Sequence, residues 1–327
     1  MAESDKPQPS VPTGRVWIVG AAGQLGRALG ARVPAHREVR GLTSADVDIA
    51  DPASVRAAFT DLNRADVVIN CAAYTNVDAA ESEPQRAAQI NAAGPGNLAA
   101  VTAAAGAWLI HLSTDYVFGG RPAGSTHTQL SDAQLAGCGR RVEPYEPDDV
   151  DPAVRPETIY GATKLDGERA ALAADPAATI IRTAWVYTGA PGSRDFVGTI
   201  RRLESERESI TVVDDQTGSP TYAGDLADGL WELAAHPRDE AVSGRVLHAT
   251  NAGVATWFDV ARAVFAELGA DPDRVRPVCT DEFPRPAPRP AYSVLSPTSW
   301  ITAGLTPLRD WRAALSAALS SDAVAAR

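Results

Sequence analysis

The chain has 327 residues and a formal net charge of −11, and hydrophobic residues make up 45% of it. That hydrophobic share is enough for a globular core, and the acidic excess argues against nucleic-acid partners and anionic membrane surfaces. Three separated cysteines without neighbouring histidines indicate reduced thiols in a cytoplasm and suggest neither a disulfide framework nor a zinc site. No run reaches the ~18 apolar residues of a membrane helix, and no divalent metal is indicated.

Short apolar runs alternate with alanine-rich helical windows, a pattern typical of βαβ units. Strands are predicted at 16–19, 38–40, 67–70, 108–112 and 179–182. Helices are predicted at 25–32, 52–59, 84–105 with a break near Gly94 and Pro95, and 159–174. The expected fold class is α/β, a doubly wound parallel Rossmann-type sheet with a smaller C-terminal substrate-binding lobe.

The expected domains follow from this pattern. Residues 1–13 lack the apolar core of a signal peptide and are predicted to form a flexible tail. Residues 14–187 are predicted to form the dinucleotide-binding domain, with 221–250 returning to it, and the substrate-binding lobe is expected at 188–220 and 251–327. The polar stretch 119–157 is long for a connection, and loops of this length are usually functional or disordered.

A glycine-rich turn, G-x-x-G-x-x-G at residues 20–26, follows the first predicted strand and opens a helix. Glycines let backbone amides approach a pyrophosphate, which the positive end of the helix then holds. This spacing is the form associated with short-chain dehydrogenases and reductases. The turn predicts a nicotinamide dinucleotide site.

The end of the second strand indicates which dinucleotide binds. Leu42, Thr43 and Ser44 offer no carboxylate for a ribose 2′-hydroxyl. With Arg37 and Arg40 nearby, NADPH is the first expectation and use of NADH as well the second. The alternative is that these arginines only solvate a strand edge.

Tyr160 and Lys164 lie about one helical turn apart, so both side chains emerge from one surface. Thr114 follows a central strand at its carboxyl end, where open α/β sheets bind ligands. Tyr160 is the expected acid for the alkoxide that hydride delivery leaves on a carbonyl. Lys164 is expected to bring the tyrosine pKa, ordinarily ~10, nearer neutrality. Each motif alone also fits an ordinary helix face, a strand cap or a turn.

Together these residues resemble the extended short-chain dehydrogenases, and within them the dTDP-4-dehydrorhamnose reductases, over nearly the whole chain. The segments that carry the resemblance are 68–78, 113–118, 160–165, 182–187 and 215–221. It implies reduction of the 4-keto group of a dTDP-linked 4-keto-6-deoxy sugar by NAD(P)H, giving dTDP-L-rhamnose.

The resemblance also implies roles for individual residues. Thr114, Tyr160 and Lys164 would be catalytic, and Thr114, Asp115 and Trp185 would contact the sugar. Together with the glycine-rich turn, the implied cofactor contacts are Gly20, Gly23, Gln24, Leu25, Gly26, Asp48, Ile49, Ala73, Tyr74, Thr75, Tyr160 and Lys164.

Other positions are weaker candidates. Residues 216–221 would form either a wall for the nucleotide base or a simple Gly-Pro turn. The candidates to pair with the substrate pyrophosphate, with surface solvation as an equal alternative, are Arg201, Arg202, Arg285 and Arg289. The chain departs from the family pattern at Thr43, where many relatives have an acid, in a longer loop at 121–143, and at Tyr292, which replaces an asparagine.

Two other functions remain open. An epimerase or dehydratase of the same superfamily would retain NAD without net redox change. A non-catalytic subunit, like the β subunit of methionine adenosyltransferase that this family also resembles, would not need the intact catalytic residues. A homodimer is compatible with the sequence.

Overall fold

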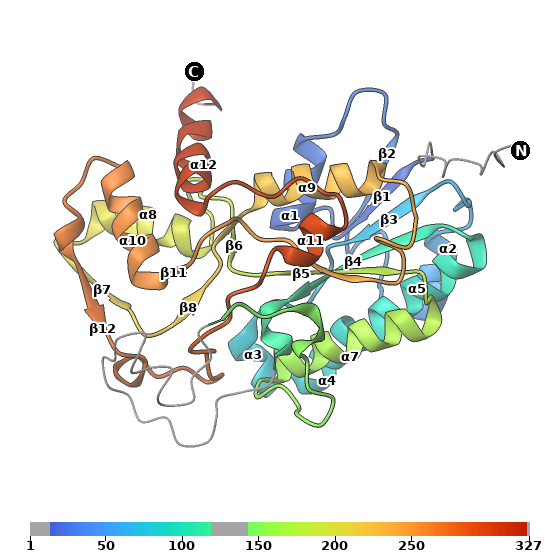
Figure 1. The fold of residues 1–327 in the computed structure, drawn as a ribbon, viewed down its shortest axis with the longest axis horizontal. Coiled ribbons are helices and arrows are strands. Elements are labelled where there is room, and N and C mark those ends of the chain that lie inside the picture. Colours follow the sequence, from blue (N-terminus) through green and yellow to red (C-terminus); the bar gives the residue numbers. More distant parts are fainter. Residues whose placement is uncertain (1–13, 119–142, 326–327) are drawn as a thin grey trace, which may run out of the picture.

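The computed structural model describes residues 14–118 and 143–325, so the expected tail at 1–13 and nearly all of the 121–143 loop lie outside the described residues. A six-stranded parallel sheet in the order β10-β5-β4-β3-β1-β2 forms the centre (Figure 1). Its strands are β1 (Val16–Val19), β2 (Val39–Leu42), β3 (Val67–Asn70), β4 (Trp108–Thr114), β5 (Thr179–Thr183) and β10 (Val246–His248). The predicted α/β fold class is confirmed.

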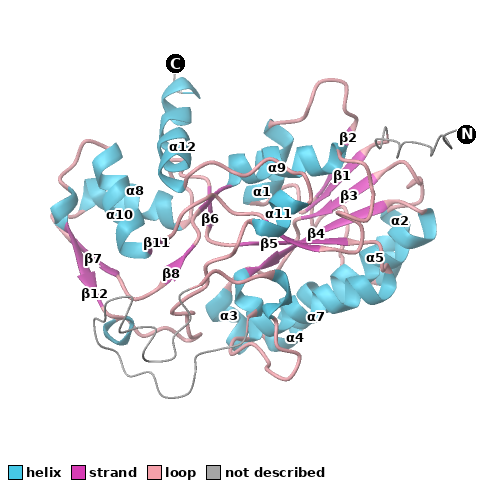
Figure 2. Cartoon of the chain, in the orientation of Figure 1, coloured by secondary structure: helices cyan, strands magenta, loops and turns pink. Residues whose placement is uncertain are grey.

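Helices cover both faces of the sheet, which explains why the central strands are continuous apolar runs (Figure 2). One face packs against α1 (Gln24–Ala31), α9 (Ala223–Ala235) and α11 (Thr298–Thr302). The other packs against α2 (Pro52–Ala58), α5 (Gly94–Ala105) and α7 (Ile159–Ala174). All seven residues of β4 are buried, so the sheet holds its carboxyl end rigidly in the middle of the molecule.

The long helix predicted at 84–105 takes a different form from the one expected. It consists of α4 (Pro84–Ala88), a π-helical turn at Gln89–Ala93 and α5, so the predicted break is a change of helical pitch. Pro95 lacks an N–H and its ring would clash with the carbonyl of Asn91, which favours such a turn. The Asn91 carbonyl faces Gly167 of α7, where an added Cβ would collide with it. A second difference is that β2 begins and ends later than the predicted strand 38–40.

The smaller lobe lies at one end of the sheet, on the left of Figure 1. It contains three short strand pairs and has its own apolar cluster around Val197, Val264 and Trp311. Its elements are β6 (Val186–Tyr187), α8 (Phe196–Glu206), β7 (Ile210–Val213), β8 (Thr217–Gly218), β9 (Thr221–Tyr222), β11 (Ala255–Thr256), α10 (Trp257–Glu267), β12 (Val275–Val278) and α12 (Trp311–Ala325). The division of the chain into two domains stays a prediction.

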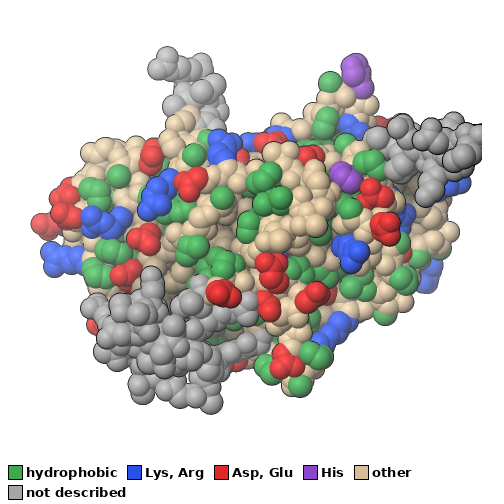
Figure 3. Space-filling view, in the orientation of Figure 1, with side chains coloured by type: hydrophobic (Ala, Val, Ile, Leu, Met, Phe, Trp, Pro, Cys, Tyr) green, Lys and Arg blue, Asp and Glu red, His purple; other side chains and the backbone are tan. Residues whose placement is uncertain are grey.

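The surface is electrostatically mixed, because acidic and basic side chains are interspersed on the face drawn in Figure 3. Among the described helices, none has the length and apolarity needed to cross a membrane.

Candidate active site

A cleft of about 1930 Å³ opens at the carboxyl ends of the central strands, between the sheet and the smaller lobe. The strand order changes direction between β1 and β3, and doubly wound sheets bind ligands at such a point. The cleft takes its lining from the glycine-rich turn, the ends of β3 and β4, α7, and the lobe elements β6, α8 and α10. The predicted cofactor-binding and substrate-binding residues therefore lie along one cleft.

The glycine-rich turn has the geometry of an anion site. Gly20, Gly23, Gln24, Leu25 and Gly26 all line the cleft. The α1 helix starts after Gly23 without a side-chain cap, so its first N–H groups have no helical acceptor. An added Cβ at Gly26 would collide with the Gly20 carbonyl oxygen, so the turn can only close around glycine. These features fit the diphosphate of a dinucleotide.

The residues that follow β2 form another wall of the cleft. They are Thr43, Ser44, Asp48 and Ile49. Asp48 Oδ1 accepts a hydrogen bond from the Ala50 amide at 3.0 Å, which shapes this wall. The site here contains hydroxyls as well as one carboxylate.

The two arginines expected to favour NADPH bind protein groups instead. Arg37 Nη2 donates to the Ala234 carbonyl at 3.1 Å. Arg40 pairs with Asp61 at 3.1 Å and lies over the Trp17 ring at 4.6 Å. Neither arginine lines the cleft, so the expectation that they receive a 2′-phosphate is not supported.

Asn91, which was not singled out from the sequence, holds the loop that follows β3. Its Oδ1 accepts from the Tyr74 amide at 2.8 Å, and its Nδ2 donates to the Tyr74 carbonyl at 3.1 Å. Ala73 and Thr75 thereby line the cleft, whereas the Tyr74 side chain does not and its phenol bonds with Glu83. The available signal in the sequence was Pro95, four residues after Asn91. A proline there favours a π-helical turn, and such turns often occur at functional sites.

Thr114, Tyr160 and Lys164 meet in the cleft. Thr114 ends β4, and its hydroxyl is hydrogen-bonded to the Tyr160 phenol and, at 3.0 Å, to Asp115 Oδ1. Lys164 is 2% exposed, and its Nζ donates to the Leu112 carbonyl at 2.6 Å. The N-terminus of α7 lies close to β4 because Gly161, which has no Cβ, packs against the backbone that follows the strand.

The pKa values of the pair are set mainly by burial. Burial raises the pKa of Tyr160 to about 12, although the hydrogen bond with Thr114 opposes this. Burial also lowers the pKa of Lys164 to about 8, while Glu168 opposes that shift. The expected tyrosine pKa nearer neutrality is therefore wrong, because the net shift of the Tyr160 pKa is upward. Desolvation of the phenol outweighs the other influences.

A buried ionic network around Glu168 lies next to Lys164. Glu168 lies one turn further along α7 and accepts from Arg182 Nε at 2.9 Å and Nη2 at 2.8 Å. Ser113 Oγ donates to the same carboxylate at 2.5 Å. Glu168 and Arg182 are each 3% exposed, so this network fixes α7 against β4 and β5.

On the substrate side, Asp115 and Trp185 both line the cleft. Burial raises the pKa of Asp115 to about 6, against hydrogen bonds from Ser293 and Thr114. Asp115 Oδ2 is buried without a hydrogen-bond partner among the described residues, which leaves it an acceptor for a ligand hydroxyl. Trp185 has a left-handed backbone, with φ of 48°, and its ring stacks on Trp257.

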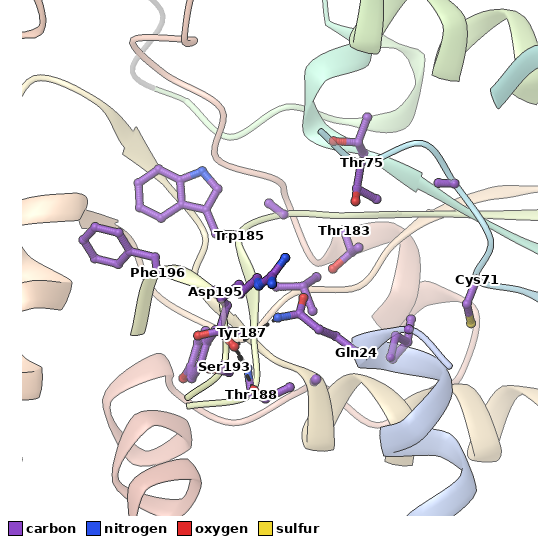
Figure 4. A pocket seen from close by; sticks show the side chains of 18 of the residues that line it. Gln24, Cys71, Thr75, Thr183, Trp185, Tyr187, Thr188, Ser193, Asp195 and Phe196 are labelled. Atoms are coloured by element: carbon purple, nitrogen blue, oxygen red, sulfur yellow. Dashed lines mark hydrogen bonds between the residues drawn. The ribbon is translucent and has the colours of Figure 1, made fainter. Parts of the chain in front are cut away.

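The glycine-rich turn is also tied directly to the lobe. Gln24 Nε2 donates to Asp195 Oδ2 at 3.0 Å, and the same oxygen accepts from Thr188 Oγ1 at 2.7 Å (Figure 4). Asp195 also caps α8. The Gln24 side chain therefore links the glycine-rich turn to the smaller lobe.

The four candidate arginines divide into two pairs. Arg285 and Arg289 line the cleft and pair with Asp78, at 3.9 Å and 3.0 Å. Arg201 donates to the Gly189 carbonyl and Arg202 pairs with Glu206, and neither lines the cleft.

Of the remaining candidates, Gln216 and Pro220 line the cleft. Tyr292 does not line it and lies near the Tyr145 ring instead, with 6.3 Å between centroids. Within the described residues no group of three His, Cys, Asp or Glu side chains is placed to hold a metal ion.

Comparison with known proteins places this chain in a family. The family model described as RmlD substrate binding domain matches residues 14–324. A dTDP-4-dehydrorhamnose reductase from Mycobacterium tuberculosis is 52% identical over 310 residues, covering 94% of this chain and 93% of that protein. A dTDP-4-keto-6-deoxy-D-glucose reductase from Streptomyces niveus is 43% identical over 94% of this chain and 96% of its own.

A solved structure gives the same result. The dTDP-4-dehydrorhamnose reductase from Bacillus anthracis, in complex with NADP, superposes with a TM-score of 0.76. It is 33% identical, and the match covers 92% of this chain and 97% of that one. The chain therefore belongs to the dTDP-4-dehydrorhamnose reductase family.

Proposed function

We propose that this protein reduces the 4-keto group of dTDP-4-dehydro-L-rhamnose to dTDP-L-rhamnose, with a nicotinamide cofactor as reductant and Tyr160 as proton donor. One observation carries the proposal: Thr114, Tyr160 and Lys164 meet in the cleft that the uncapped glycine-rich turn also lines. The name of the relative from M. tuberculosis supports the choice of sugar.

In this proposal the bound cofactor supplies a hydride to the carbonyl carbon. Thr114 and Tyr160 donate hydrogen bonds to the carbonyl oxygen, and Tyr160 gives its proton to the alkoxide that forms. Because its pKa is about 12, the phenol is protonated at neutral pH and is a stronger acid than a sugar hydroxyl. Lys164, with a pKa of about 8, is mostly charged and stabilises the resulting phenolate.

The cofactor proposal keeps NADPH first and NADH second. Thr43 and Ser44 line the cleft beyond β2 and bear hydroxyls that tolerate a 2′-phosphate better than a carboxylate does. The NADP complex of the relative from B. anthracis supports this order. A cytoplasmic location and a homodimer stay predictions.

The test is an absorbance assay at the nicotinamide band, with NADH and NADPH supplied separately to the purified protein. We expect one cofactor equivalent to be oxidised for each dTDP-4-dehydrorhamnose reduced. The substrate of the S. niveus relative serves as the competing 4-keto sugar. Conversion of the sugar without net cofactor consumption would support an epimerase or dehydratase, and no conversion at all would support a binding subunit. Near-normal turnover by Tyr160→Phe would overturn the assignment of the acid.

A further inference from the structure

The indole of Trp185 packs against two segments of the lobe. Trp257 covers one face, with 3.6 Å between ring centroids and 6° between the planes. Gly218 also lies against the indole, because an added Cβ there would be 2.5 Å from Trp185 Cζ2 and 2.8 Å from Nε1.

Other elements of the lobe fix the position of Trp257. Trp257 is the first residue of α10, which begins with a capping box between Thr256 and Asp259. Phe196 of α8 packs against its ring, with 4.5 Å between centroids. The β8–β11 pairing sets Gly218 opposite Ala255, two residues before Trp257. One short strand pair therefore brings in both neighbours of the Trp185 indole.

The backbone of Trp185 also needs this support. Its φ of 48° lies in the left-handed region, which a bulky residue adopts only where its surroundings fix it. Trp185, Trp257 and Phe196 all line the cleft that contains Tyr160, and Figure 4 shows Trp185 and Phe196 on the lobe side of that cleft.

We propose that Trp257 is a positioning residue for the substrate sugar and acts through Trp185. Because Trp257 covers one face of the indole, the sugar meets the part of Trp185 that the stack leaves exposed. The position of the indole sets how the sugar lies against Thr114 and Tyr160. This inference rests on the proposed function, and it assigns Trp257 and Gly218 to sugar binding with no part in cofactor binding.

The stack itself can be observed without substrate. All seven tryptophans lie in the described residues, and Trp185–Trp257 is the indole pair found in ring contact there. In a nitrogen–proton NMR spectrum each tryptophan gives one indole N–H signal, and the ring current of Trp257 displaces that of Trp185. We expect Trp257→Ala to move the Trp185 signal, which Trp185→Phe assigns. The control Trp231→Phe should remove only its own signal.

Kinetics then test the positioning role. An aromatic pair contributes enough for Trp257→Ala to raise the KM for dTDP-4-dehydrorhamnose roughly 2- to 10-fold, with the KM for the cofactor unchanged. Trp257→Phe, which keeps a stacking ring, should recover most of the loss. Gly218→Ala places a methyl group against the indole and displaces it, so it should also raise the KM for the sugar and leave the KM for the cofactor unchanged.

The outcomes separate this inference from the proposed function. If Trp257→Ala leaves the Trp185 signal in place, or moves it without changing the KM for the sugar, the positioning role is refuted while the reductase assignment stands. A wild-type protein that oxidises neither cofactor with any 4-keto sugar overturns both. If Trp257→Ala collapses the other indole signals through misfolding, Gly218→Ala and Trp257→Phe decide the question.

Discussion

Replacing Lys164 with methionine should make the protein more stable while removing its activity. Lys164 is 2% exposed, and burial lowers its pKa from 10.5 to about 8. At about 1.4 kcal/mol per pKa unit, keeping the buried ammonium charged costs about 3 kcal/mol relative to the unfolded chain. The methionine variant loses the hydrogen bond to the Leu112 carbonyl, which lowers its stability by about 1 kcal/mol. Lys164→Met should therefore raise the free energy of unfolding at neutral pH by about 2 kcal/mol.

The stability difference between the wild type and Lys164→Met should depend on pH. Between pH 8 and pH 10.5 the unfolded chain binds the lysine proton more tightly than the folded protein does. Wild-type stability relative to the variant therefore rises with pH through that window, and the advantage of Lys164→Met shrinks. Below pH 8 both states are protonated and the difference is constant.

Urea unfolding of the wild type and Lys164→Met across this window measures the effect. The chain has two lysines, Lys6 and Lys164, so lysine side-chain NMR follows the titration directly, and Lys6→Met is the matched control. A variant less stable than the wild type at neutral pH, or a Lys164 signal that titrates near its ordinary value, would refute the reasoning.

Three further predictions concern the acid, the buried network and the glycine-rich turn. Tyr160→Phe should lower kcat by about 10²- to 10⁴-fold in the cofactor assay, because it removes the proton donor. Glu168→Ala leaves its buried arginine partner unpaired and should cost about 3–5 kcal/mol in urea unfolding. Its control, Arg202→Ala, breaks an exposed i,i+4 pair and should cost about 0.5 kcal/mol or less. Gly26→Ala collides with backbone and should weaken cofactor binding in a fluorescence titration, whereas Gly30→Ala, which meets nothing within 4 Å, should stabilise α1 by about 0.5–1 kcal/mol.

These predictions have distinct contrary outcomes. Equal losses from Glu168→Ala and Arg202→Ala would mean that the buried network contributes no more than a surface pair. Unchanged cofactor affinity in Gly26→Ala would mean that the turn does not bind the diphosphate.

The sequence predicted those parts of the fold whose signal is local. The strands β1 and β3 and the helix α7 match their predicted ranges, because a buried strand is a short apolar run and Thr158 caps the helix from within its own segment. The glycine-rich turn is local in the same way. The two- and four-residue strands of the lobe carry no such periodicity and were not predicted.

The remaining site features depend on tertiary contacts. Asn91 holds the loop after β3 only because a π-helical turn aims it there. The raised pKa of Tyr160 reflects burial by elements that no local pattern reveals. The stack of Trp185 on Trp257 joins segments that only the lobe brings together.

The position of β10 in the sheet bears on how the protein is made. β5 pairs with β4 on one side and with β10 on the other, but the lobe elements β6 to β9 and the helix α9 lie between β5 and β10 in the chain. At ~5–20 residues per second, a ribosome would leave the apolar edge of β5 unpaired for on the order of several seconds. An open strand edge is a template for another chain, so the nascent protein is most exposed to aggregation in this interval.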